Sequence, residues 1–342
     1  MDTVRLGKSE LQVTRVGFGG IPIQRVSDED AERVIRRAFE LGVRFFDTAH
    51  GYGSSEERIG EALEAEREHL VLATKTPARD RGGALGHLEL SLKRLRTDAI
   101  DLWQLHNVSR KEDYSKVIAP GGALEAAREA LQAGVVKHIG LSSHSMDIAL
   151  LATRSGLFET IQFPFNYVTN EAADELIPLA SKHDVGFIGM KPFGGGMLDD
   201  ARLSIKYVLQ WDNVVPDPGI ETLEDIEEII EILNGDRGLS ETSKQEIERI
   251  RSEVGNRFCR RCGYCLPCPV GIPIPAVLNL TSFIRRFSTE VILGGNRPEI
   301  ARKAARCLRC GECEARCPYG LSIREMLVEN VRAFDEFHES CA

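Results

Sequence analysis

The sequence predicts an α/β protein, a (β/α)8 TIM barrel followed by a small α-helical domain. Eight strand-like runs alternate with amphipathic helical runs along the first two thirds of the chain, and all nine cysteines lie beyond residue 258. A length of 342 residues suits one large α/β barrel plus a small appendage. We therefore expect a barrel over residues 1–235, a linker helix over 236–254 and a cysteine-rich domain over 255–342.

The strand candidates are short runs of β-branched and aromatic residues bounded by turn residues. They cover residues 13–20, 43–49, 70–76, 99–107, 135–143, 160–167, 185–193 and 213–220. Helical patterns lie between them. Residues 27–42, SDEDAERVIRRAFELG, begin with a capping serine and acidic residues and end at a glycine, and residues 121–134 also end at a glycine.

The number of strands and the absence of one motif favour a barrel over a doubly wound sheet. A dinucleotide-binding sheet carries GxGxxG after its first strand, whereas the first strand here ends in GFGG. In a barrel, the carboxyl ends of the strands converge on one mouth, and the chemistry of this architecture takes place there. Polar residues at strand ends are therefore the first candidates for a functional site.

Composition limits the class of function. The chain has 42% hydrophobic and 28% charged residues and no run of about 18 apolar residues, so we expect no membrane span. The N-terminus lacks the apolar segment of a secretory signal, which predicts a cytoplasmic protein. A net charge of -9 argues against nucleic-acid binding.

The charge of the tail differs from that of the rest. Residues 255–342 hold 13 Lys and Arg against 9 Asp and Glu, so the tail is +4 and the remainder is -13. A basic tail fits either an acidic partner or anionic, thiolate-bound metal clusters.

Four strand-end residues suggest proton-transfer chemistry. Asp47 ends the second strand and precedes Tyr52, while Lys75 and His106 end the third and fourth strands. Taken singly, each residue fits a structural role, such as an ion pair or a buried histidine. Taken together, they could form a proton donor, in which Lys75 lowers the pKa of the Tyr52 phenol from about 10. Asp47 would then hold the ammonium group and His106 would orient a carbonyl oxygen, with His50 at the rim.

These residues lie in segments that resemble the aldo-keto reductase family. The matching segments are VRLGKSELQVTRVGFGG, FFDTAHGYGSSEERIGEAL, LATKT, DLWQLHN and IGLSSHS followed by QFPFNY, within residues 4–233. The resemblance implies reduction of a small-molecule carbonyl, or the reverse oxidation of an alcohol, by a nicotinamide cofactor. It also implies an Asp, Tyr, Lys, His catalytic tetrad, here Asp47, Tyr52, Lys75 and His106.

The resemblance implies cofactor-binding residues as well. Ser142 and Gln162 match positions that hydrogen-bond the nicotinamide carboxamide, and the PFGGG run, with Pro192 and Gly194, matches a loop on the pyrophosphate side. Ser143, Met190 and Gly219 complete the predicted set. Two of these depart from the family pattern: Ser143 replaces the usual asparagine, and Met190 replaces an aromatic ring that many members place under the nicotinamide.

The segment DPGIETLEDIEE after the last strand bears on the choice between NAD(H) and NADP(H). Glu221, Glu224 and Asp225 would repel a 2'-phosphate, which favours NAD(H). The alternative is that these acids form the first turn of a helix, where acidic residues are favoured by the helix dipole.

Two cysteine motifs predict iron-sulfur clusters in the tail. Cys307, Cys310, Cys313 and Cys317 have the C-x2-C-x2-C-x3-C-P spacing of bacterial ferredoxins. Cys259, Cys262, Cys265 and Cys268 match its first three positions, with the fourth one residue early. The alternative is zinc, which paired CxxC units also bind. Disulfides are disfavoured in a reducing cytoplasm. We expect two 4Fe-4S clusters.

The resemblance to two-cluster ferredoxins implies that the fourth cysteine of each motif binds the other cluster. That pairing gives one set of Cys259, Cys262, Cys265 and Cys317 and a second set of Cys268, Cys307, Cys310 and Cys313. Residues 276–287 and 297–305, between the motifs, are each predicted to be a helix, which favours an α-helical ferredoxin-like module. Cys341 has no motif and is expected to be an exposed terminal thiol.

Three hypotheses join the two parts, because a nicotinamide moves two electrons as hydride whereas a 4Fe-4S cluster accepts one. In the first, which we favour, the barrel is a carbonyl reductase and the cluster module is structural or a redox-sensitive lid. In the second, the clusters exchange electrons with a flavoprotein partner or a redox-active substrate that the barrel binds. In the third, the barrel senses nicotinamide and gates an electron carrier, which the complete tetrad disfavours.

Overall fold

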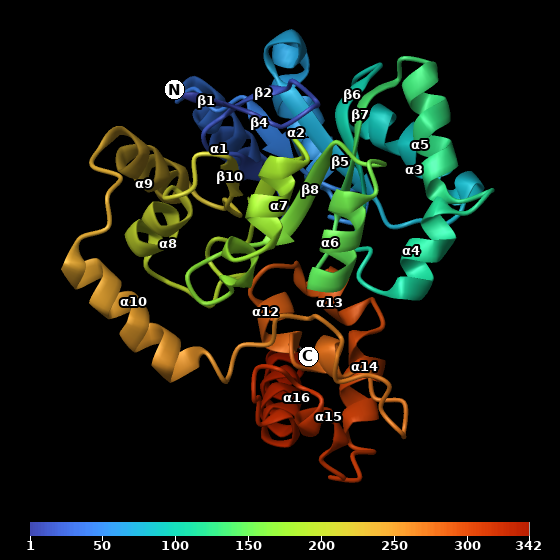
Figure 1. Cartoon of the computed structure of the whole chain (residues 1–342), viewed down its shortest axis with the longest axis vertical. Helices are drawn as coiled ribbons and strands as arrows, with labels where there is room; N and C mark the ends of the chain where they lie inside the picture. The colour runs from blue at the N-terminus through green and yellow to red at the C-terminus, as the bar shows by residue number, and fades with distance from the viewer. Residues whose placement is uncertain (342) are drawn as a thin grey trace. The chain divides into compact units, whose positions relative to one another are not determined.

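The computed structural model describes residues 1–341 and divides into two compact units. The first unit comprises Met1–Gly194 and Leu198–Leu239, and the second comprises Gly195–Met197 and the chain from Ser240 onward. All strands of the described residues lie in the first unit, and the second is helical (Figure 1).

Eight parallel strands form a closed barrel in the first unit. They are β3 (Phe18–Gly19), β4 (Phe45–Asp47), β5 (Val71–Thr76), β6 (Ile100–Leu105), β7 (Val136–Ser142), β8 (Thr160–Pro164), β9 (Gly186–Met190) and β10 (Val214–Asp217), paired in sequence order. The last strand meets the first, because Gly19 bridges Gly219 in parallel and the Gly17 N–H donates to the Pro216 carbonyl at 2.9 Å. This closure confirms the predicted barrel.

Helices follow the strands and pack against one another around the barrel. Their bounds are α1 (Asp28–Glu40), α2 (Ser55–Leu63), α3 (Arg81–Arg94), α4 (Lys111–Ile118), α5 (Ala123–Gln132), α6 (Met146–Arg154), α7 (Leu176–Lys182), α8 (Ala201–Val208) and α9 (Leu223–Asn234), with short 3-10 helices at Pro22–Arg25, Glu64–His69 and Glu171–Ala173. Helix α1 contacts α2 and α9, α8 contacts α9, and α3 contacts α5. The Ser27 hydroxyl caps α1 by accepting a hydrogen bond from the Asp30 N–H.

The barrel strands are apolar because they are covered on both faces. Every residue of β6 and β10 is buried, between the barrel interior and the outer helices. An antiparallel hairpin of β1 (Thr3–Arg5) and β2 (Gln12–Thr14) packs Leu6 and Val13 against Phe45, Leu102 and Ile188. This apolar cluster fills the amino end of the barrel and leaves the polar residues at the carboxyl end.

The predicted first strand, residues 13–20, is wrong as a single strand. Its first two residues belong to the hairpin, and the barrel strand covers Phe18–Gly19 alone. The chain turns between these pieces, where the Thr14 hydroxyl donates to the Val16 carbonyl at 2.8 Å and the Arg15 N–H donates to the Asp2 carbonyl at 2.9 Å. A continuous strand-like sequence pattern cannot reveal such a side-chain-stabilised turn.

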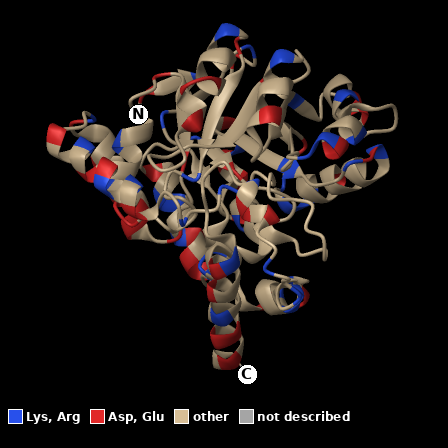
Figure 2. Cartoon of the chain, turned by 60° about the horizontal axis from the view of Figure 1, so that its bottom comes forward, with Lys and Arg blue, Asp and Glu red and all other residues tan. Residues whose placement is uncertain are grey.

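The second unit is built around its last helix. It contains α10 (Glu241–Val254), α11 (Ile274–Val277), α12 (Leu280–Ile284), α13 (Thr289–Leu293), α14 (Arg297–Ala304), α15 (Glu312–Ala315) and α16 (Ile323–Ser340). Helix α16 contacts α11, α12, α14 and α15 and buries Ile323, Leu327 and Phe334. Its outer residues are charged, with both signs along the helix (Figure 2).

The predicted helix over residues 276–287 is interrupted in the structure. Helix α11 ends at Val277 and α12 begins at Leu280. Between them, the Asn279 side-chain amide donates to the Pro275 carbonyl at 2.8 Å, and the Asn279 backbone N–H donates to Ala276 instead. The side chain thus takes the acceptor that a continuous helix would use.

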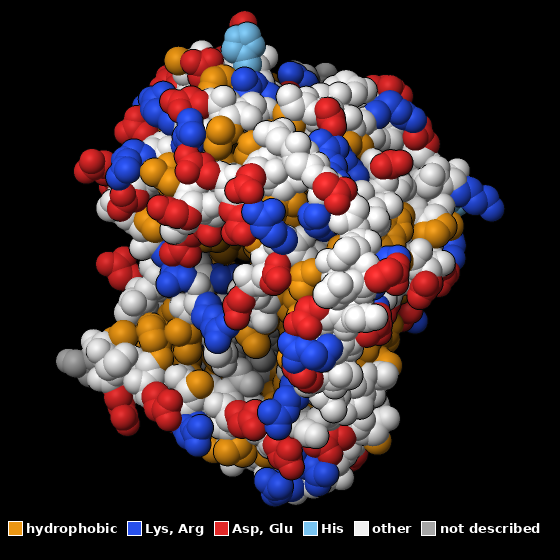
Figure 3. Space-filling model, turned by 90° about the vertical axis from the view of Figure 1, so that its left-hand side faces the viewer, with side chains coloured by type: hydrophobic (Ala, Val, Ile, Leu, Met, Phe, Trp, Pro, Cys, Tyr) orange, Lys and Arg blue, Asp and Glu red, His pale blue; other side chains and the backbone are white. Residues whose placement is uncertain are grey.

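The described surface carries charges of both signs. Figure 3 shows acidic and basic side chains interspersed with hydrophobic ones over the face that it draws. Within residues 1–341, no helix is long and apolar enough to span a membrane.

Candidate functional site

The carboxyl ends of neighbouring strands bring the predicted tetrad together at the mouth of the barrel. Asp47 is the last residue of β4, Lys75 is the penultimate residue of β5 and His106 directly follows β6. Tyr52 lies in the turn after β4, where its N–H donates to the Ala49 carbonyl at 2.9 Å. The parallel register therefore places Asp47, Lys75 and His106, of which Asp47 and Lys75 are 28 residues apart, around one space.

Asp47 and Lys75 form a buried ion pair through Asp47 Oδ2 and Lys75 Nζ, and their side chains are 2% and 1% exposed. The same ammonium donates to the Thr48 carbonyl at 2.7 Å. Burial acts to lower the pKa of Lys75, but the charge of Asp47, followed by those of Tyr52 and Asp217, outweighs burial and raises the pKa. Lys75 is therefore a fixed cation in the barrel interior.

Tyr52 lies between this cation and His106. The Lys75 ammonium is 4.9 Å from the centroid of the Tyr52 ring, and the rings of Tyr52 and His106 meet edge to face with centroids 5.5 Å apart. Both side chains are half-buried, so they can face a bound molecule at the mouth. The arrangement combines the Tyr52 hydroxyl, the Lys75 ammonium and the His106 imidazole. Together, such groups can protonate the oxygen atom of a bound molecule.

Two buried glutamines hold Asp47 from the other strands. Gln104 Nε2 donates to Asp47 Oδ1 at 3.2 Å, and Gln162 Nε2 donates to Asp47 Oδ2 at 3.2 Å. The side-chain oxygens of both glutamines are buried and have no hydrogen-bond partner within residues 1–341. A buried acceptor without a donor is costly, so these oxygens suit a ligand that donates hydrogen bonds, such as a carboxamide NH2 group.

Sequence reasoning missed a further acid, Asp217, at the end of β10. Its carboxyl is buried, and the Gln162 amide that donates to Asp47 also donates to Asp217 Oδ2, at 3.0 Å. Burial, and then the charge of Asp47, raises the pKa of Asp217 well above its usual range, against the opposite effect of Lys75. The strand-end rule that selected Asp47 could have selected the aspartate in VVPD.

The predicted cofactor-binding serines differ in their contacts. Ser142 ends β7, and its hydroxyl accepts a hydrogen bond from the Asn107 N–H at 2.8 Å. The Ser143 hydroxyl donates to the Ser145 carbonyl at 3.2 Å and accepts from the Ser145 N–H at 3.0 Å. The Ser143 hydroxyl is therefore engaged in its own turn, whereas Ser142 lies beside the segment that follows β6.

The remaining predicted cofactor residues surround the ends of the last two strands. Met190 ends β9 and pairs in register with Asp217. Pro192 and Gly194 follow in the same loop, where Gly194 has a φ of 57°. A Cβ on Gly219 would lie 2.9 Å from Pro22, so a side chain there would crowd the chain after β3.

Another polar chain at the mouth was not foreseen from the sequence. Lys191 Nζ lies 2.8 Å from His144 Nε2, and His144 Nδ1 lies 3.2 Å from Asn107 Oδ1. The amide oxygen can only accept, so His144 carries its proton on Nδ1 and accepts from Lys191 through Nε2.

His50, predicted to lie at the rim, is half-buried and stacks on His87 with ring centroids 3.8 Å apart. Burial, and then the nearby His87 and Arg94, lowers the pKa of His50 to about 4. Its imidazole is therefore neutral through the physiological range.

The second unit contains two separate pockets lined by cysteines. One, of about 300 Å³, is lined by Cys259, Cys262, Cys265 and Cys317, together with Tyr319, Arg260 and other residues. The other, of about 390 Å³, is lined by Cys268, Cys307, Cys310 and Cys313, together with Arg316 and Arg324. In each pocket, three cysteines come from one motif and the fourth comes from the other motif.

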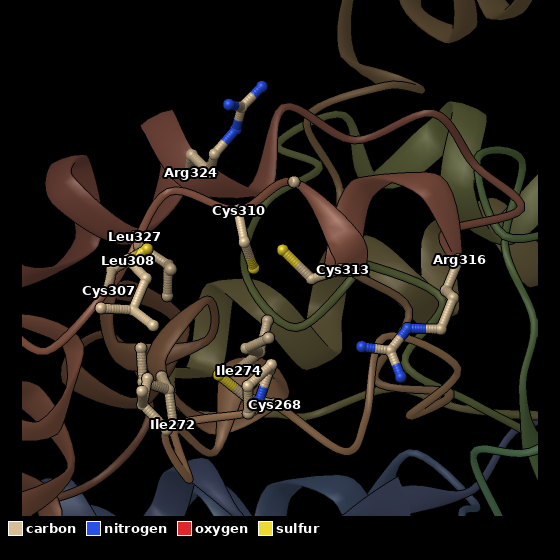
Figure 4. A pocket seen from close by; sticks show the side chains of 13 residues that line it. Cys268, Ile272, Ile274, Cys307, Leu308, Cys310, Cys313, Arg316, Arg324 and Leu327 are labelled. Carbon is tan, nitrogen blue, oxygen red and sulfur yellow. The ribbon is translucent and has the colours of Figure 1, made fainter.

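Figure 4 shows the larger pocket, with sulfur atoms from separate segments directed toward its interior. Within residues 1–341, no three His, Cys, Asp or Glu side chains lie close enough together to hold one metal ion. Four thiols around a larger space suit a cubane, in which each thiolate binds its own iron. Burial, and then Cys259 and Cys262, raises the pKa of the Cys265 thiol to about 12, so cluster binding would have to displace its proton.

The fold and the mouth together define a (β/α)8-barrel protein with a buried Asp–Lys pair beside a tyrosine, followed in sequence by a helical unit with cysteine-lined pockets. The aldo/keto reductase family model matches residues 15–240, and the model of a 4Fe-4S dicluster domain matches residues 258–322. The chain belongs to the aldo/keto reductase family and is an oxidoreductase with a C-terminal 4Fe-4S domain.

Individual relatives agree with this assignment. The uncharacterized oxidoreductase YqkF of Bacillus subtilis is 27% identical over 255 residues, covering 70% of this chain and 81% of the relative. L-galactose dehydrogenase of Arabidopsis thaliana is 28% identical over 214 residues, covering 57% of this chain and 66% of the relative. The holo structure of aldo-keto reductase AKR11C1 from Bacillus halodurans shares the fold, with a TM-score of 0.64 at 23% identity over 73% of this chain and 96% of that one.

Proposed function

We propose that the barrel reduces a carbonyl compound with a nicotinamide cofactor, or oxidises the corresponding alcohol, and that Tyr52 is the general acid. The observation that carries the proposal is the buried Lys75–Asp47 pair beside Tyr52, because a fixed cation stabilises the negative charge that forms on the phenol oxygen. When bound, the nicotinamide supplies or accepts the hydride. Either direction suits the site, and one relative is named L-galactose dehydrogenase.

Each side chain of the tetrad has a distinct role in this proposal. The Tyr52 hydroxyl gives its proton to the carbonyl oxygen of the substrate, and Lys75 stabilises the resulting phenolate. Asp47 keeps the Lys75 ammonium in place, and His106 orients the carbonyl oxygen beside the Tyr52 ring. In the oxidative direction, the Tyr52 phenolate takes the proton back from the alcohol.

The residues at the mouth fit a nicotinamide. The Gln162 side-chain oxygen is a buried acceptor without a donor, which suits the carboxamide NH2, and Ser142 stands on the neighbouring strand. Met190, Pro192, Gly194 and Gly219 lie around the ends of the last two strands and complete the proposed cofactor site, together with Ser143. Ser143 belongs to this set through the family resemblance, since its hydroxyl is engaged in its own turn and its N–H donates to the Gln162 carbonyl at 3.0 Å.

The choice between NAD(H) and NADP(H) rests on the segment after β10. Asp225 is part of a capping box with Thr222, and the carboxylate of Glu221 lies 3.5 Å from Arg25. These contacts give both acids a structural role, and Glu224 remains in the exposed first turn of α9. We propose a preference for NAD(H) that is due to Glu224. A lower KM for NADPH in Glu224→Lys would support this preference. An unchanged ratio of the KM values for NADPH and NADH would contradict it.

We propose that the second unit holds two 4Fe-4S clusters with swapped fourth ligands. Cys259, Cys262, Cys265 and Cys317 would bind one cluster, and Cys268, Cys307, Cys310 and Cys313 would bind the other. The lining of the two pockets supports these sets. Nearby arginines, Arg260 at one pocket and Arg316 and Arg324 at the other, would offset the negative charge of thiolate-bound clusters.

A second candidate function is one-electron exchange between the clusters and a redox partner such as a flavoprotein. The observation that favours it is the exposure of Cys310, which would bring one cluster near the protein surface. In this alternative, the barrel binds the substrate or a nicotinamide, and the protein serves as an electron carrier.

Isotope transfer tests the proposed reaction. The anaerobically purified protein is incubated with NADH or NADPH deuterated at the transferring position of the nicotinamide and with a panel of aldehydes and ketones. We expect deuterium on the former carbonyl carbon of the product. Cofactor oxidation that leaves no deuterium on that carbon would contradict hydride transfer and favour the electron-carrier alternative.

A further inference from the structure

Asp217 is a buried ionisable group that the proposed mechanism does not use. Its side chain comes from β10, the strand that pairs with β9 and closes the barrel onto β3, and it is 6% exposed. Asp47, Lys75 and Asp217 together place three ionisable groups in the barrel interior. The mouth therefore contains one more acid than the ion pair needs.

The surroundings of Asp217 show what it can interact with. Asp47 on β4 and Lys75 on β5 are the charged groups beside it, and Gln162 on β8 donates a hydrogen bond to it at 3.0 Å. A Cβ on Gly17 would lie 3.2 Å from Asp217 Oδ1 and 2.8 Å from the Phe45 ring, so this side of the carboxyl is closed by backbone and an aromatic ring. The carboxyl is thus enclosed by one cation, one carboxyl and neutral groups.

The charges balance only when one of the two carboxyls keeps a proton. Lys75 is positive, and one carboxylate neutralises it. A second carboxylate in the same enclosure would be an uncompensated buried charge, next to a like charge, which is strongly unfavourable. The Gln162 side-chain NH2 group donates to Oδ2 of both carboxyls, at 3.2 Å and 3.0 Å, so the two acids lie side by side, and the buried Asp217 Oδ1 has no hydrogen-bond partner within residues 1–341. Asp47 keeps the charge, since it forms the direct contact with Lys75.

We propose that Asp217 is a positioning residue for the barrel reaction: as a neutral carboxylic acid it donates a hydrogen bond to Asp47 and so leaves the Lys75 ammonium available to Tyr52. The inference rests on the proposed function. When the O–H bond of Tyr52 breaks and the proton joins the carbonyl oxygen, Lys75 faces two anions. The hydrogen bond from Asp217 withdraws charge from Asp47, and Asp217 retains its proton throughout.

Two substitutions separate this role from simple packing. Asp217→Asn keeps the shape and an N–H donor toward Asp47, whereas Asp217→Leu keeps the branching of the side chain but removes the donor. We expect Asp217→Leu to lower kcat by about tenfold or more, with KM for the carbonyl changed much less, and Asp217→Asn to lower kcat less. Asp212→Asn, an exposed change in the loop before β10, is the matched control and should leave kcat unaltered.

The pH dependence of kcat tests the role of the Asp217 proton, because a loss of packing alone would not change it. In the natural protein, kcat should fall at alkaline pH both when Asp217 loses its proton and when the general acid Tyr52 does. In Asp217→Asn only the fall caused by Tyr52 should remain, so the alkaline limb should change its position or steepness. Equal kcat in Asp217→Leu and the natural protein, or the same alkaline limb in Asp217→Asn, would overturn the proposal.

A direct measurement of protonation keeps the test independent of turnover. With aspartate labelled at its carboxyl carbon by 13C, the resonance lost in Asp217→Asn identifies Asp217. We expect its shift to be that of a neutral acid near neutral pH. An ionised Asp217 would overturn the inference even in an active enzyme, while a neutral Asp217 in a protein without carbonyl reduction would count against the proposed function alone.

Discussion

The mouth of the barrel and the cysteine pockets of the second unit are built in opposite ways. At the mouth, the ionisable side chains are partners of one another: Lys75 pairs with Asp47, and one amide of Gln162 bridges Asp47 and Asp217. In the second unit, each pocket is lined by four thiols, the kind of side chain that binds iron in 4Fe-4S clusters. The ionisable groups of the mouth are held by one another, whereas the cysteine pockets would depend on an inorganic partner.

The two regions also differ in how far the sequence reveals them. The cysteine motifs are local, since each spans about a dozen residues with a spacing that is typical of 4Fe-4S clusters. The sequence alone therefore predicted the iron-sulfur domain. The mouth is assembled from distant strands. Strand ends and the family resemblance selected Asp47, Tyr52, Lys75 and His106, whose proximity depends on parallel register.

Residues outside the local patterns were missed for physical reasons. The pairing of Asp217 with Asp47 depends on closure of β10 onto β3, which joins opposite ends of the barrel sequence. The hairpin of β1 and β2 and the break at Asn279 depend on side-chain hydrogen bonds that a periodic pattern does not show. Local chemistry is thus readable from sequence, while contacts that depend on register and closure are not.

Removal of iron should produce the largest difference between the two regions. Treatment of the anaerobic protein with a chelator and an oxidant should unfold much of the second unit, because cluster binding contributes to its folding, and leave the barrel folded. Hydrogen exchange by mass spectrometry can follow both units in one sample. Equal protection of the second unit from hydrogen exchange before and after iron removal would contradict this difference between the two regions.

Double cysteine variants test the swapped ligand sets. Cys265→Ser with Cys317→Ser alters one proposed cluster, so the pair should lose about half of the iron, as either single variant does. Cys313→Ser with Cys317→Ser alters both clusters and should lose nearly all of it. Iron and sulfide analysis decides between these outcomes. If Cys313→Ser with Cys317→Ser retains as much iron as the other double or more, the swap is wrong.

Lys75→Met should destabilise the barrel, because it leaves buried carboxyls without their cation. Breaking a buried pair in this way costs about 3–5 kcal/mol, less whatever is recovered when Asp47 takes up a proton. Denaturant unfolding of the barrel, followed by tryptophan fluorescence, measures the change. Lys182→Met, at an exposed position of α7, is the control, and a loss no greater than that of the control would contradict the account.

His50 should give a small, pH-dependent effect at the rim. Its folded-state pKa of about 4 lies below the unfolded value of about 6.5, so its contribution to stability is complete above the unfolded value and is lost as the pH falls toward the folded one. The stability difference between the natural protein and His50→Gln should therefore shrink on acidification. A constant difference across this range would contradict the lowered pKa.

The central claim is that the barrel moves the proton with its own side chains and the hydride through a nicotinamide that it would bind, without electrons from the clusters. The most direct test is the turnover of NAD(P)H-dependent carbonyl reduction in Tyr52→Phe and in a variant that lacks cluster cysteines but keeps a folded barrel. We expect Tyr52→Phe to lower kcat by about 10²–10⁴-fold, as for loss of a general acid, and the cysteine variant to retain turnover. Full activity in Tyr52→Phe, or its loss with the clusters, would contradict the claim.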